Sequence, residues 1–418
     1  MQAAEYSRFS GLVYERSLGK RAPVEVSIEV THRCPLNCQH CYNNLPMGDS
    51  AARTSELSLD EYRRLLTELQ QAGALWLLFT GGEIFGRKDF PEIYKEAKKR
   101  GFLITLFTNG TLITPAIADM LVEWRPFAIE ITLYGATRET YEALTQIPGS
   151  YDRCMRGVRL LLDRDLPLKL KTVPTTVNRH EVYEMKRMSE EDFGVEFKFD
   201  PLVTPRTDCS ASPLSVRLTP EEAVALEYFD PRRSAEYKRL AGVSRAMDSD
   251  TVYSCGGGLS ACAIDPTGKI SICVISHRDM YDWRKGSFQE GWDTFLLQTR
   301  SKKKTRASRC DRCAIQSLCS MCPANAELEM GDPESPVDFL CQVAHLRAYA
   351  QDLKVPEHGN CPNCAGGENY TAIQLSAERI ANHQIDVGSW RPREKNLLPV
   401  LQSSHGCGPS ACGSCSSH

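Results

Sequence analysis

The chain has 418 residues and a formal net charge of -3, so it exceeds one average domain and carries no basic surplus for neutralising nucleic-acid phosphates. No window approaches the roughly 20 apolar residues that a membrane span needs. Residues 1–20 lack the apolar core of a signal peptide. We therefore expect a cytoplasmic protein with neither a nucleic-acid nor a membrane partner.

Apolar runs alternate with helical patterns along the first half of the chain. Runs typical of buried strands occupy residues 24–30, 75–80, 102–107, 128–133, 168–173 and 195–199. Helices are predicted between them, beginning near Ser58, Pro91 and Thr114-Pro115, where capping residues or proline occur. This alternation predicts an α/β fold with a parallel sheet and right-handed crossovers. About six such units fall short of an eightfold barrel.

The 18 cysteines are clustered, and a reducing cytosol does not support a disulfide framework. Three fall within residues 34–41, eight between Cys255 and Cys341, and five between Cys361 and Cys415. Cys154 and Cys209 stand alone, and we take them as ordinary thiols. Clustering at ligand spacings indicates metal sites.

The first cluster has the spacing C-x3-C-x2-C, at Cys34, Cys38 and Cys41. It follows the strand at 24–30, so it lies on the loop at the carboxyl end of a strand, where barrel enzymes place their chemistry. Structural zinc and ordinary four-iron clusters take four protein ligands, whereas three thiolates leave one iron open to a small molecule. The alternatives are a zinc knuckle or three unrelated thiols.

This motif resembles that of the radical S-adenosylmethionine (radical SAM) superfamily, with His40 in the place of the usual aromatic residue. The resemblance implies a partial (β/α)6 TIM-like barrel and a 4Fe–4S cluster whose open iron binds SAM. It also implies an enzyme that reductively cleaves SAM to a 5′-deoxyadenosyl radical, which then abstracts a substrate hydrogen.

Gly81-Gly82-Glu83 ends the second predicted strand. The glycines let the backbone approach a ligand, and the carboxylate can accept from an ammonium group. In radical SAM proteins this motif binds the amino group of SAM, although Ile84 stands here where proline is usual. The alternative is a strand-ending turn. The resemblance also implies SAM contacts for Asn109 and Thr132, whose alternatives are a common turn and an ordinary strand residue.

The second cysteine field contains a predicted β-hairpin that turns at Asp265-Pro266-Thr267-Gly268. Its spacings resemble the SPASM domain, although the gap before Cys322 is one residue short. The resemblance implies two auxiliary 4Fe–4S clusters, hence three clusters in all. The implied ligands are Cys255, Cys262, Cys273 and Cys322 for the first, and Cys310, Cys313, Cys319 and Cys341 for the second. The alternative is a pair of zinc sites.

Members of the SPASM group mostly modify ribosomally made peptides, so the resemblance implies a peptide or protein substrate. Val274 follows Cys273 where anaerobic sulfatase maturases place an acidic residue, so we expect a different reaction. Arg206, Tyr281 and Asp282 are the polar residues predicted as substrate contacts, against ordinary surface or hairpin roles. An electron donor such as flavodoxin or ferredoxin is implied, as is a separate leader-recognition protein if leader binding is needed.

Two other readings compete with a peptide-modifying enzyme. One is a non-catalytic iron–sulfur or metal-binding electron carrier, against which the predicted SAM site argues. The other is a radical SAM enzyme that acts on a small metabolite.

The predicted organisation is an N-terminal extension (1–22), a barrel (23–235), an auxiliary-cluster domain with its linker (236–350) and a tail (351–418). The tail is rich in Cys, Gly and Ser, with one helical patch at 372–381, and we expect it to be poorly ordered. Three roles are open for it: a flexible tail, a fused peptide substrate, or a metal site. The metal ligands would be Cys361, Cys364, His405, Cys407, Cys412 and Cys415.

Overall fold

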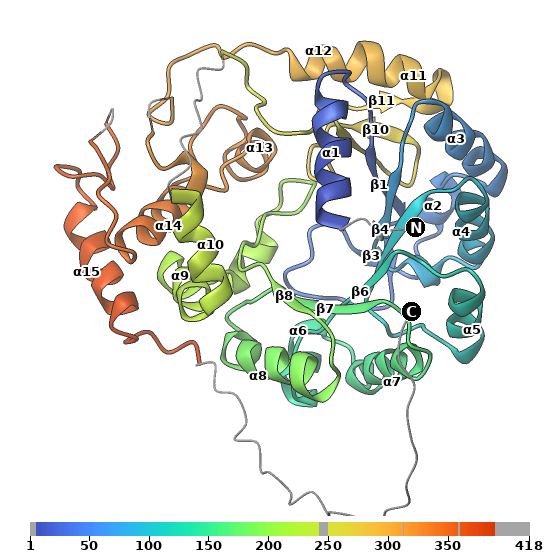
Figure 1. The fold of residues 1–418 in the computed structure, drawn as a ribbon, viewed down its shortest axis with the longest axis horizontal. Coiled ribbons are helices and arrows are strands. Elements are labelled where there is room, and N and C mark those ends of the chain that lie inside the picture. The colour runs from blue at the N-terminus through green and yellow to red at the C-terminus, as the bar shows by residue number, and fades with distance from the viewer. Residues whose placement is uncertain (1–5, 242–249, 312, 358–359, 389–418) are drawn as a thin grey trace, which may run out of the picture.

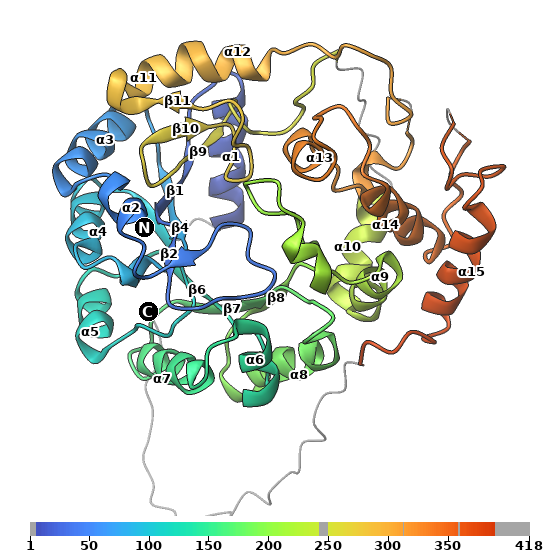
Figure 2. The same cartoon turned by 180° about the vertical axis from the view of Figure 1, so that it is seen from behind.

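The computed structural model describes residues 6–241, 250–311, 313–357 and 360–388. A nine-stranded sheet in the order β11-β10-β9-β1-β4-β5-β6-β7-β8 forms its centre (Figures 1 and 2). The predicted strand–helix alternation is confirmed. The six parallel strands of the first half are β1 (Glu25–Thr31), β4 (Trp76–Gly81), β5 (Leu103–Thr108), β6 (Ala128–Thr132), β7 (Leu168–Thr172) and β8 (Phe197–Phe199).

Helices cover the outer face of this curved sheet (Figure 1). They are α3 (Leu59–Gln71), α4 (Phe90–Lys99), α5 (Pro115–Glu123), α6 (Arg138–Thr145), α7 (Ser150–Leu162) and α8 (Val182–Arg187). The predicted start of α3 is confirmed, because the Ser58 hydroxyl accepts from the Glu61 amide and the Glu61 carboxylate accepts from the Ser58 amide. Three short elements lie at or after the first cysteine loop: β2 (Arg33–Cys34), which pairs with β3 (Leu45–Pro46), and α2 (Ser50–Ser55).

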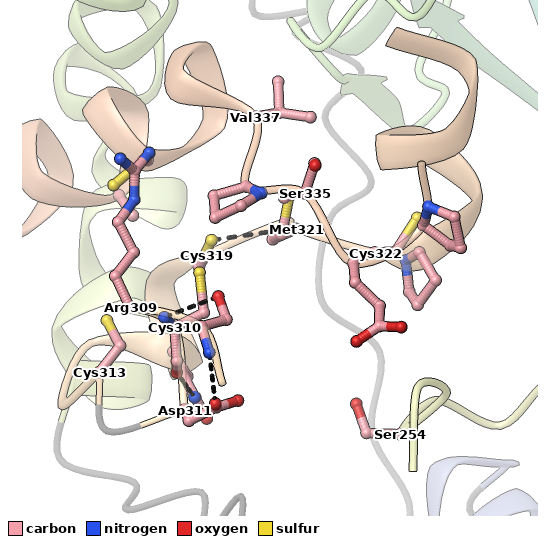
Figure 3. A pocket seen from close by; sticks show the side chains of 18 of the residues that line it. Ser254, Arg309, Cys310, Asp311, Cys313, Cys319, Met321, Cys322, Ser335 and Val337 are labelled. Carbon is pink, nitrogen blue, oxygen red and sulfur yellow. Dashed lines mark hydrogen bonds between the residues drawn. The ribbon is translucent and has the colours of Figure 1, made fainter. Parts of the chain in front are cut away.

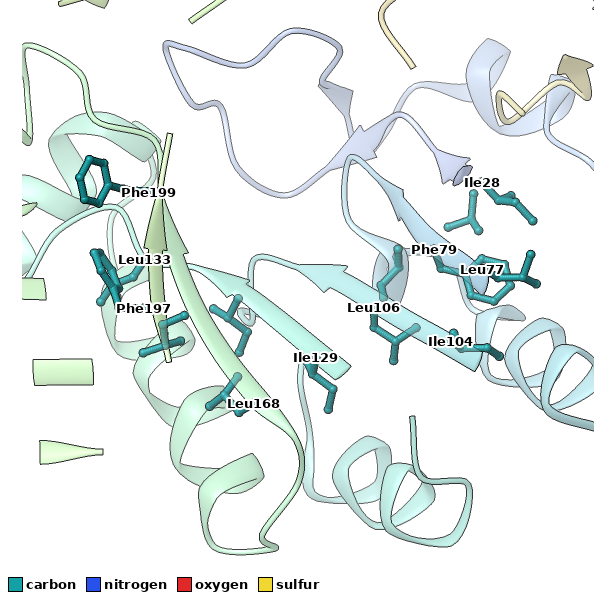
Figure 4. Close-up of a cluster of buried hydrophobic side chains, with 14 of the residues drawn as sticks. Ile28, Leu77, Phe79, Ile104, Leu106, Ile129, Leu133, Leu168, Phe197 and Phe199 are labelled. Carbon is teal, nitrogen blue, oxygen red and sulfur yellow. The ribbon is translucent and has the colours of Figure 1, made fainter. Parts of the chain in front are cut away.

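Alternate residues of each strand face the helices and form the core (Figure 4). Phe79 and Leu106 lie opposite each other in the register of β4 and β5, and both are fully buried. Residues at the intervening positions of the strands, such as Phe107 and Glu130, face the other side of the sheet and are only partly buried. That inner side is therefore lined by a mixture of apolar and charged side chains.

The predicted hairpin is confirmed, and it extends the barrel sheet. Its strands are β9 (Ala261–Ile264) and β10 (Lys269–Ser271), and the Asp265 carboxylate accepts from the amide of Lys269 at the turn. Strand β9 pairs in parallel with β1, and β11 (Tyr281–Asp282) pairs with β10 at the edge. The cysteine-rich region therefore shares one sheet with the barrel.

The remaining helices, apart from α1, lie beyond the two edges of the sheet. The helices not yet named are α1 (Tyr6–Leu18), α9 (Pro220–Phe229), α10 (Pro231–Ala241), α11 (Phe288–Glu290), α12 (Leu297–Arg300), α13 (Pro323–Met330), α14 (Asp338–Tyr349) and α15 (Tyr370–Ala381). None of the helices in the described ranges is long and apolar enough to cross a bilayer.

The expectation of a poorly ordered tail from residue 351 does not hold for its described part, up to residue 388. The predicted helical patch forms α15, which packs against α9 and α14. Ile380 and Val387 are fully buried in the main core. Spaced apolar residues in this segment supply enough buried surface to fold onto the rest of the chain. His405, Cys407, Cys412 and Cys415 lie outside the described residues.

Candidate iron–sulfur and S-adenosylmethionine site

The loop that carries Cys34, Cys38 and Cys41 follows β1, as predicted. The amides of Asn37 and Gln39 donate to carbonyls at the end of α6, at 3.0 and 3.2 Å. These bonds fix the loop over the carboxyl ends of the parallel strands. The three thiols therefore lie at one end of the barrel.

Gly81 and Gly82 bring the loop after β4 into direct backbone contact with the cysteine loop. The Gly82 amide donates to Thr31 O at 2.7 Å, and the Glu83 amide donates to Arg33 O at 3.0 Å. A Cβ on Gly82 would lie 2.5 Å from Arg33 O, and Gly81 has a φ of +125°. Both positions thus require glycine for packing.

Glu83 is fully buried, and its carboxylate accepts three hydrogen bonds from the protein. The donors are the Thr108 hydroxyl at 2.7 Å, the Asn109 amide at 2.8 Å and the Phe85 amide at 3.1 Å. Burial raises the pKa of this carboxyl, and the three donors oppose the shift. The side chain therefore ties the ends of β4 and β5 together.

Asn109 directly follows β5, and Thr132 is the last residue of β6. The Asn109 side-chain amide donates to Cys34 Sγ at 3.5 Å, so this residue lies beside one of the three thiols. Thr132 closes β6 and is partly buried on the inner side of the sheet. Of the five predicted SAM contacts, Gly82, Glu83 and Asn109 are thus joined by hydrogen bonds to the cysteine loop or to the strand end before it, and Gly81 packs against the backbone of Thr31.

The chemistry of the three thiols fits ligands of iron cations. Burial raises the pKa of Cys34 to about 12, with a further contribution from the negative charge of Glu83. Burial likewise raises the pKa values of Cys38 and Cys41. Thiolates in such a place need compensating cations, which bound iron supplies.

His40, in the aromatic position of the motif, packs against Tyr134 with ring centroids 5.2 Å apart. Burial lowers the pKa of His40 to about 4, so the ring is neutral at physiological pH and serves as an apolar packing group. This explains how a histidine can stand where an aromatic side chain is usual.

The predicted substrate contacts lie in different places. Arg206 donates to Cys41 O at 3.2 Å and to Asn44 Oδ1 at 2.7 Å, so it holds the cysteine loop. Tyr281 donates to Glu290 at 2.7 Å, and Asp282 accepts from the Arg284 amide, both at the β11 edge of the sheet. These bonds give all three residues structural partners.

Sequence reasoning missed a charged pair on the inner side of the barrel. Lys171 on β7 donates to Glu130 on β6 at 3.2 Å, and it lies over the ring of Phe107. Burial lowers the pKa of Lys171 to about 8, and the charge of Glu130 opposes the shift. The alternation of β6 and β7 was the signal, because charged residues recur there at inward positions.

The first auxiliary set is brought together in part. Burial raises the pKa of Cys273 to about 12, and the nearby thiols of Cys322 and Cys255 raise it further. Cys262 is 3% exposed and lies in the main hydrophobic core. Burial raises its pKa, and the charged group that opposes this shift is Arg21 rather than another cysteine. Three of the four predicted ligands therefore influence one another, and the fourth lies in the core.

The second auxiliary set lines a cavity (Figure 3). Cys310, Cys313 and Cys319 lie on one side of it, and Cys322 lies across from them. Cys322 is thus set apart from these three cysteines in the cavity. The fourth predicted ligand, Cys341, also lines the cavity.

His345 contacts Cys364, and Cys361 lies beside Cys341. The Cys341 thiol next to it lowers the pKa of Cys361 to about 3, with a contribution from His345, and the contact with Cys361 raises the pKa of Cys341. Sequence reasoning named the two tail cysteines but missed His345. The signal was its spacing, four residues after Cys341, which places both on one helical face.

Comparison with known proteins agrees with this geometry. Residues 28–188 match the model of the Radical SAM superfamily, so the chain carries a radical SAM domain and is an enzyme of this kind. The chain is 26% identical over 332 residues to an AdoMet-dependent heme synthase of Methanosarcina barkeri, covering 74% of this chain and 94% of the relative. It is 24% identical over 359 residues to the mycofactocin maturase MftC of Mycobacterium tuberculosis, covering 82% and 90%.

The fold matches solved structures of Streptococcus suis SuiB. In its complex with S-adenosylmethionine the TM-score is 0.59, and with the precursor peptide SuiA it is 0.60. Sequence identity is 16% in both comparisons, and 82% of each chain is covered. These structures therefore support the fold class, an α/β radical SAM architecture followed by a cysteine-rich region.

Proposed function

We propose that this enzyme reductively cleaves S-adenosylmethionine and abstracts a hydrogen atom from a peptide or protein side chain. The observation that carries the first part is the position of Cys34, Cys38 and Cys41 beside Gly82 and Asn109 at the carboxyl ends of the strands. When bound there, a reduced four-iron cluster supplies the electron that cleaves SAM to methionine and a 5′-deoxyadenosyl radical.

The surrounding residues would orient SAM. Gly81 and Gly82 keep the space next to the cysteine loop free of side chains. The Glu83 carboxylate already accepts three protein hydrogen bonds. We therefore propose that its main role is to fix the loop that binds the amino group of SAM. Asn109 and Thr132 would contact the bound molecule from β5 and β6.

We further propose two auxiliary clusters, which would bring the total to three. The first would use Cys255, Cys273 and Cys322 with Cys262, which must turn out of the core to take part. The second would use Cys310, Cys313 and Cys319, with Cys341 on the wall of the same cavity. Their role would be electron transfer or substrate contact, with a small iron–sulfur or flavin protein as the external reductant.

A peptide substrate is favoured because MftC, a maturase by name, is covered over 90% of its length. Leader recognition, if required, would fall to a separate protein, and the site of action would be the cytoplasm. A small metabolite is the second candidate, since the relative from Methanosarcina barkeri is a heme synthase covered over 94% of its length.

The test is the yield of 5′-deoxyadenosine from anaerobically reconstituted, dithionite-reduced protein supplied with SAM. We expect clear formation by the wild type and by Cys209→Ser, whose thiol is exposed and belongs to no ligand set. Formation should be lost in Cys34→Ala, Cys38→Ala and Cys41→Ala. Absence of 5′-deoxyadenosine from iron-loaded wild type, with and without candidate peptides or porphyrins, would favour the electron-carrier alternative.

A further inference from the structure

We propose that Cys341, His345, Cys361 and Cys364 bind one zinc ion, separate from the iron–sulfur clusters. The four donors come from two segments, helix α14 and the turn at residues 361–364. Among the residues that the structure describes, Cys341, His345 and Cys361 form the one set of potential ligands whose donor atoms all lie within 4.8 Å of one another. Three of the four proposed donors are thus grouped closely enough for a single ion, and Cys364 Sγ lies 3.3 Å from His345 Nε2.

The helix supplies the first two donors. Cys341 and His345 are four residues apart on α14, so they lie on the same face one turn from each other. Cys341 Sγ lies 3.8 Å from His345 Nδ1, the ring nitrogen that would not bind the ion, so the thiol lies beside the imidazole ring. His345 is 1% exposed, so its ring is held inside the protein rather than in solvent.

The turn supplies the other two. In Cys361-Pro362-Asn363-Cys364, the Cys364 amide donates to Cys361 O at 3.4 Å, and Gly367 N donates to Cys364 O at 2.8 Å. A Cβ on Gly367 would lie 2.4 Å from Pro362 O, so the chain can close this turn because glycine stands there. Cys361 and Cys364 are 5% and 1% exposed.

The distances around Cys361 and His345 are close to those at a tetrahedral ion, and Cys364, which lies outside the set of three, would complete the shell by a small shift. Zinc bonds of about 2.3 Å to sulfur and about 2.0 Å to nitrogen place neighbouring donor atoms roughly 3.5 to 3.8 Å apart. Cys361 Sγ lies 4.0 Å from Cys341 Sγ and 3.7 Å from His345 Nε2. Cys364 Sγ lies 3.3 Å from the same nitrogen.

The groups around the donors orient them for metal binding. His345 Nδ1 lies 2.8 Å from Cys341 O and donates to it, which leaves the lone pair on Nε2 directed at Cys361 and Cys364. The Asn363 side-chain amide donates to Cys341 Sγ at 3.2 Å, as expected beside a thiolate ligand. Asn363 is held in turn by Asn369, which donates to its side-chain oxygen at 3.2 Å.

This assignment takes Cys341 from the second auxiliary cluster. Two cysteines on different irons of one cluster are held farther apart than two on a single ion, because the irons themselves separate them. Cys341 and Cys361, at 4.0 Å, are spaced for a single ion. Cys310, Cys313 and Cys319 are then the thiolates left to that cluster, and the zinc ion fastens residues 361–364 to α14.

The experiment is metal analysis of the full chain purified anaerobically with its clusters. We expect about one zinc ion per chain in the wild type, with a zinc X-ray absorption spectrum that fits three sulfur atoms and one nitrogen. Cys364→Ser should lose most of the zinc and keep its iron, since Cys364 does not line the cluster cavity. Cys209→Ser is the matched thiol control and should keep both metals.

Two results would overturn the proposal. One is loss of iron rather than zinc in Cys364→Ser, which would make the tail pair cluster ligands. The other is wild-type protein that holds far less than one zinc ion after anaerobic zinc loading, or whose zinc shell differs from three sulfurs and one nitrogen. The second measurement needs no variant, so it decides the matter even if Cys364→Ser fails to fold. SAM cleavage plays no part in either readout, so this inference and the proposed function can fail independently.

Discussion

At the scale of single residues, the candidate SAM site depends on close backbone contacts as much as on the cysteines. Gly82 lies where any side chain would meet the carbonyls of both His32 and Arg33 at 2.5 Å. Glu83 next to it binds the start of the Thr108–Asn109 segment. The position of the cysteine loop is thus set by neighbouring loops that form hydrogen bonds with it and with the end of β1.

Gly82→Ala should therefore disturb the cysteine loop. We expect a loss of about 1–3 kcal/mol in the free energy of unfolding from overpacking. We also expect reduced iron content at the first cluster and a lower yield of 5′-deoxyadenosine. Denaturant unfolding and iron analysis measure these effects. Gly48→Ala is the control, since a Cβ there meets nothing within 4 Å. Equal iron content in the two variants would contradict the packing argument.

Lys171 should behave as an unusually acidic amine. With a pKa of about 8, its fraction deprotonated rises with pH through about 8, so acylation should reach half of its maximal rate near that pH. Peptide mass spectrometry after brief labelling at each pH gives the midpoint. Glu130→Gln removes the charge that raises the pKa, so the midpoint should move lower. Glu196→Gln, beside Lys169, should leave it unchanged. A midpoint above 10 in the wild type would contradict the buried placement.

At the scale of elements, α9 and α14 are joined by an ion pair that solvent does not reach. Both Arg347 and Glu227 side chains are nearly fully buried, and two nitrogens of Arg347 donate to the two oxygens of Glu227 at 2.8 Å. Arg347 also donates to Leu318 O at 2.7 Å. Because α14 carries Cys341 and His345, this pair helps to position the proposed zinc site.

Arg347→Met should lower the free energy of unfolding by about 3–5 kcal/mol, because it leaves the charge of Glu227 buried and uncompensated. Arg138→Met is the matched control. Its partner Asp152 lies at 2.6 Å, but both side chains are about half exposed, so we expect a loss of about 0–1 kcal/mol. Chemical denaturation of both variants tests the contrast. Equal losses would show that burial does not govern the Arg347 pair.

At the scale of the whole molecule, the cysteine-rich region is continuous with the barrel. Strand β9 pairs with β1, and Trp283 Nε1 donates to Glu68 on α3 at 2.9 Å. The Leu57 amide donates to Pro266 O at 2.8 Å at the hairpin turn. Removing the second half would uncover the edge of β1 together with the core side chains that pack against it.

A chain ending at residue 241 should therefore fail to fold independently. We expect aggregation, or loss of cooperative thermal unfolding, by size-exclusion chromatography and calorimetry. A chain ending at residue 388 keeps every described element and should unfold as the full chain does. A monomeric 1–241 protein with the unfolding temperature of the full chain would overturn the view that the shared sheet is needed for stability.

The sequence by itself determined the elements, because strands and helices follow local apolar periodicity. The six barrel strands, the hairpin at Asp265–Gly268 and the capped start of α3 at Ser58 were all predictable in this way. The spacing of Cys34, Cys38 and Cys41 after the first strand also sufficed to predict where the barrel places its chemistry.

Only the tertiary structure decided which distant groups meet. Cys361 and Cys364 belong to a segment whose composition suggested disorder, yet folding of α15 onto α9 and α14 brings them to His345. Pairing of β9 with β1 joins two regions that the sequence presents as separate domains. Contacts between residues far apart in the chain depend on how all the elements pack at once, and no local pattern in the sequence encodes them.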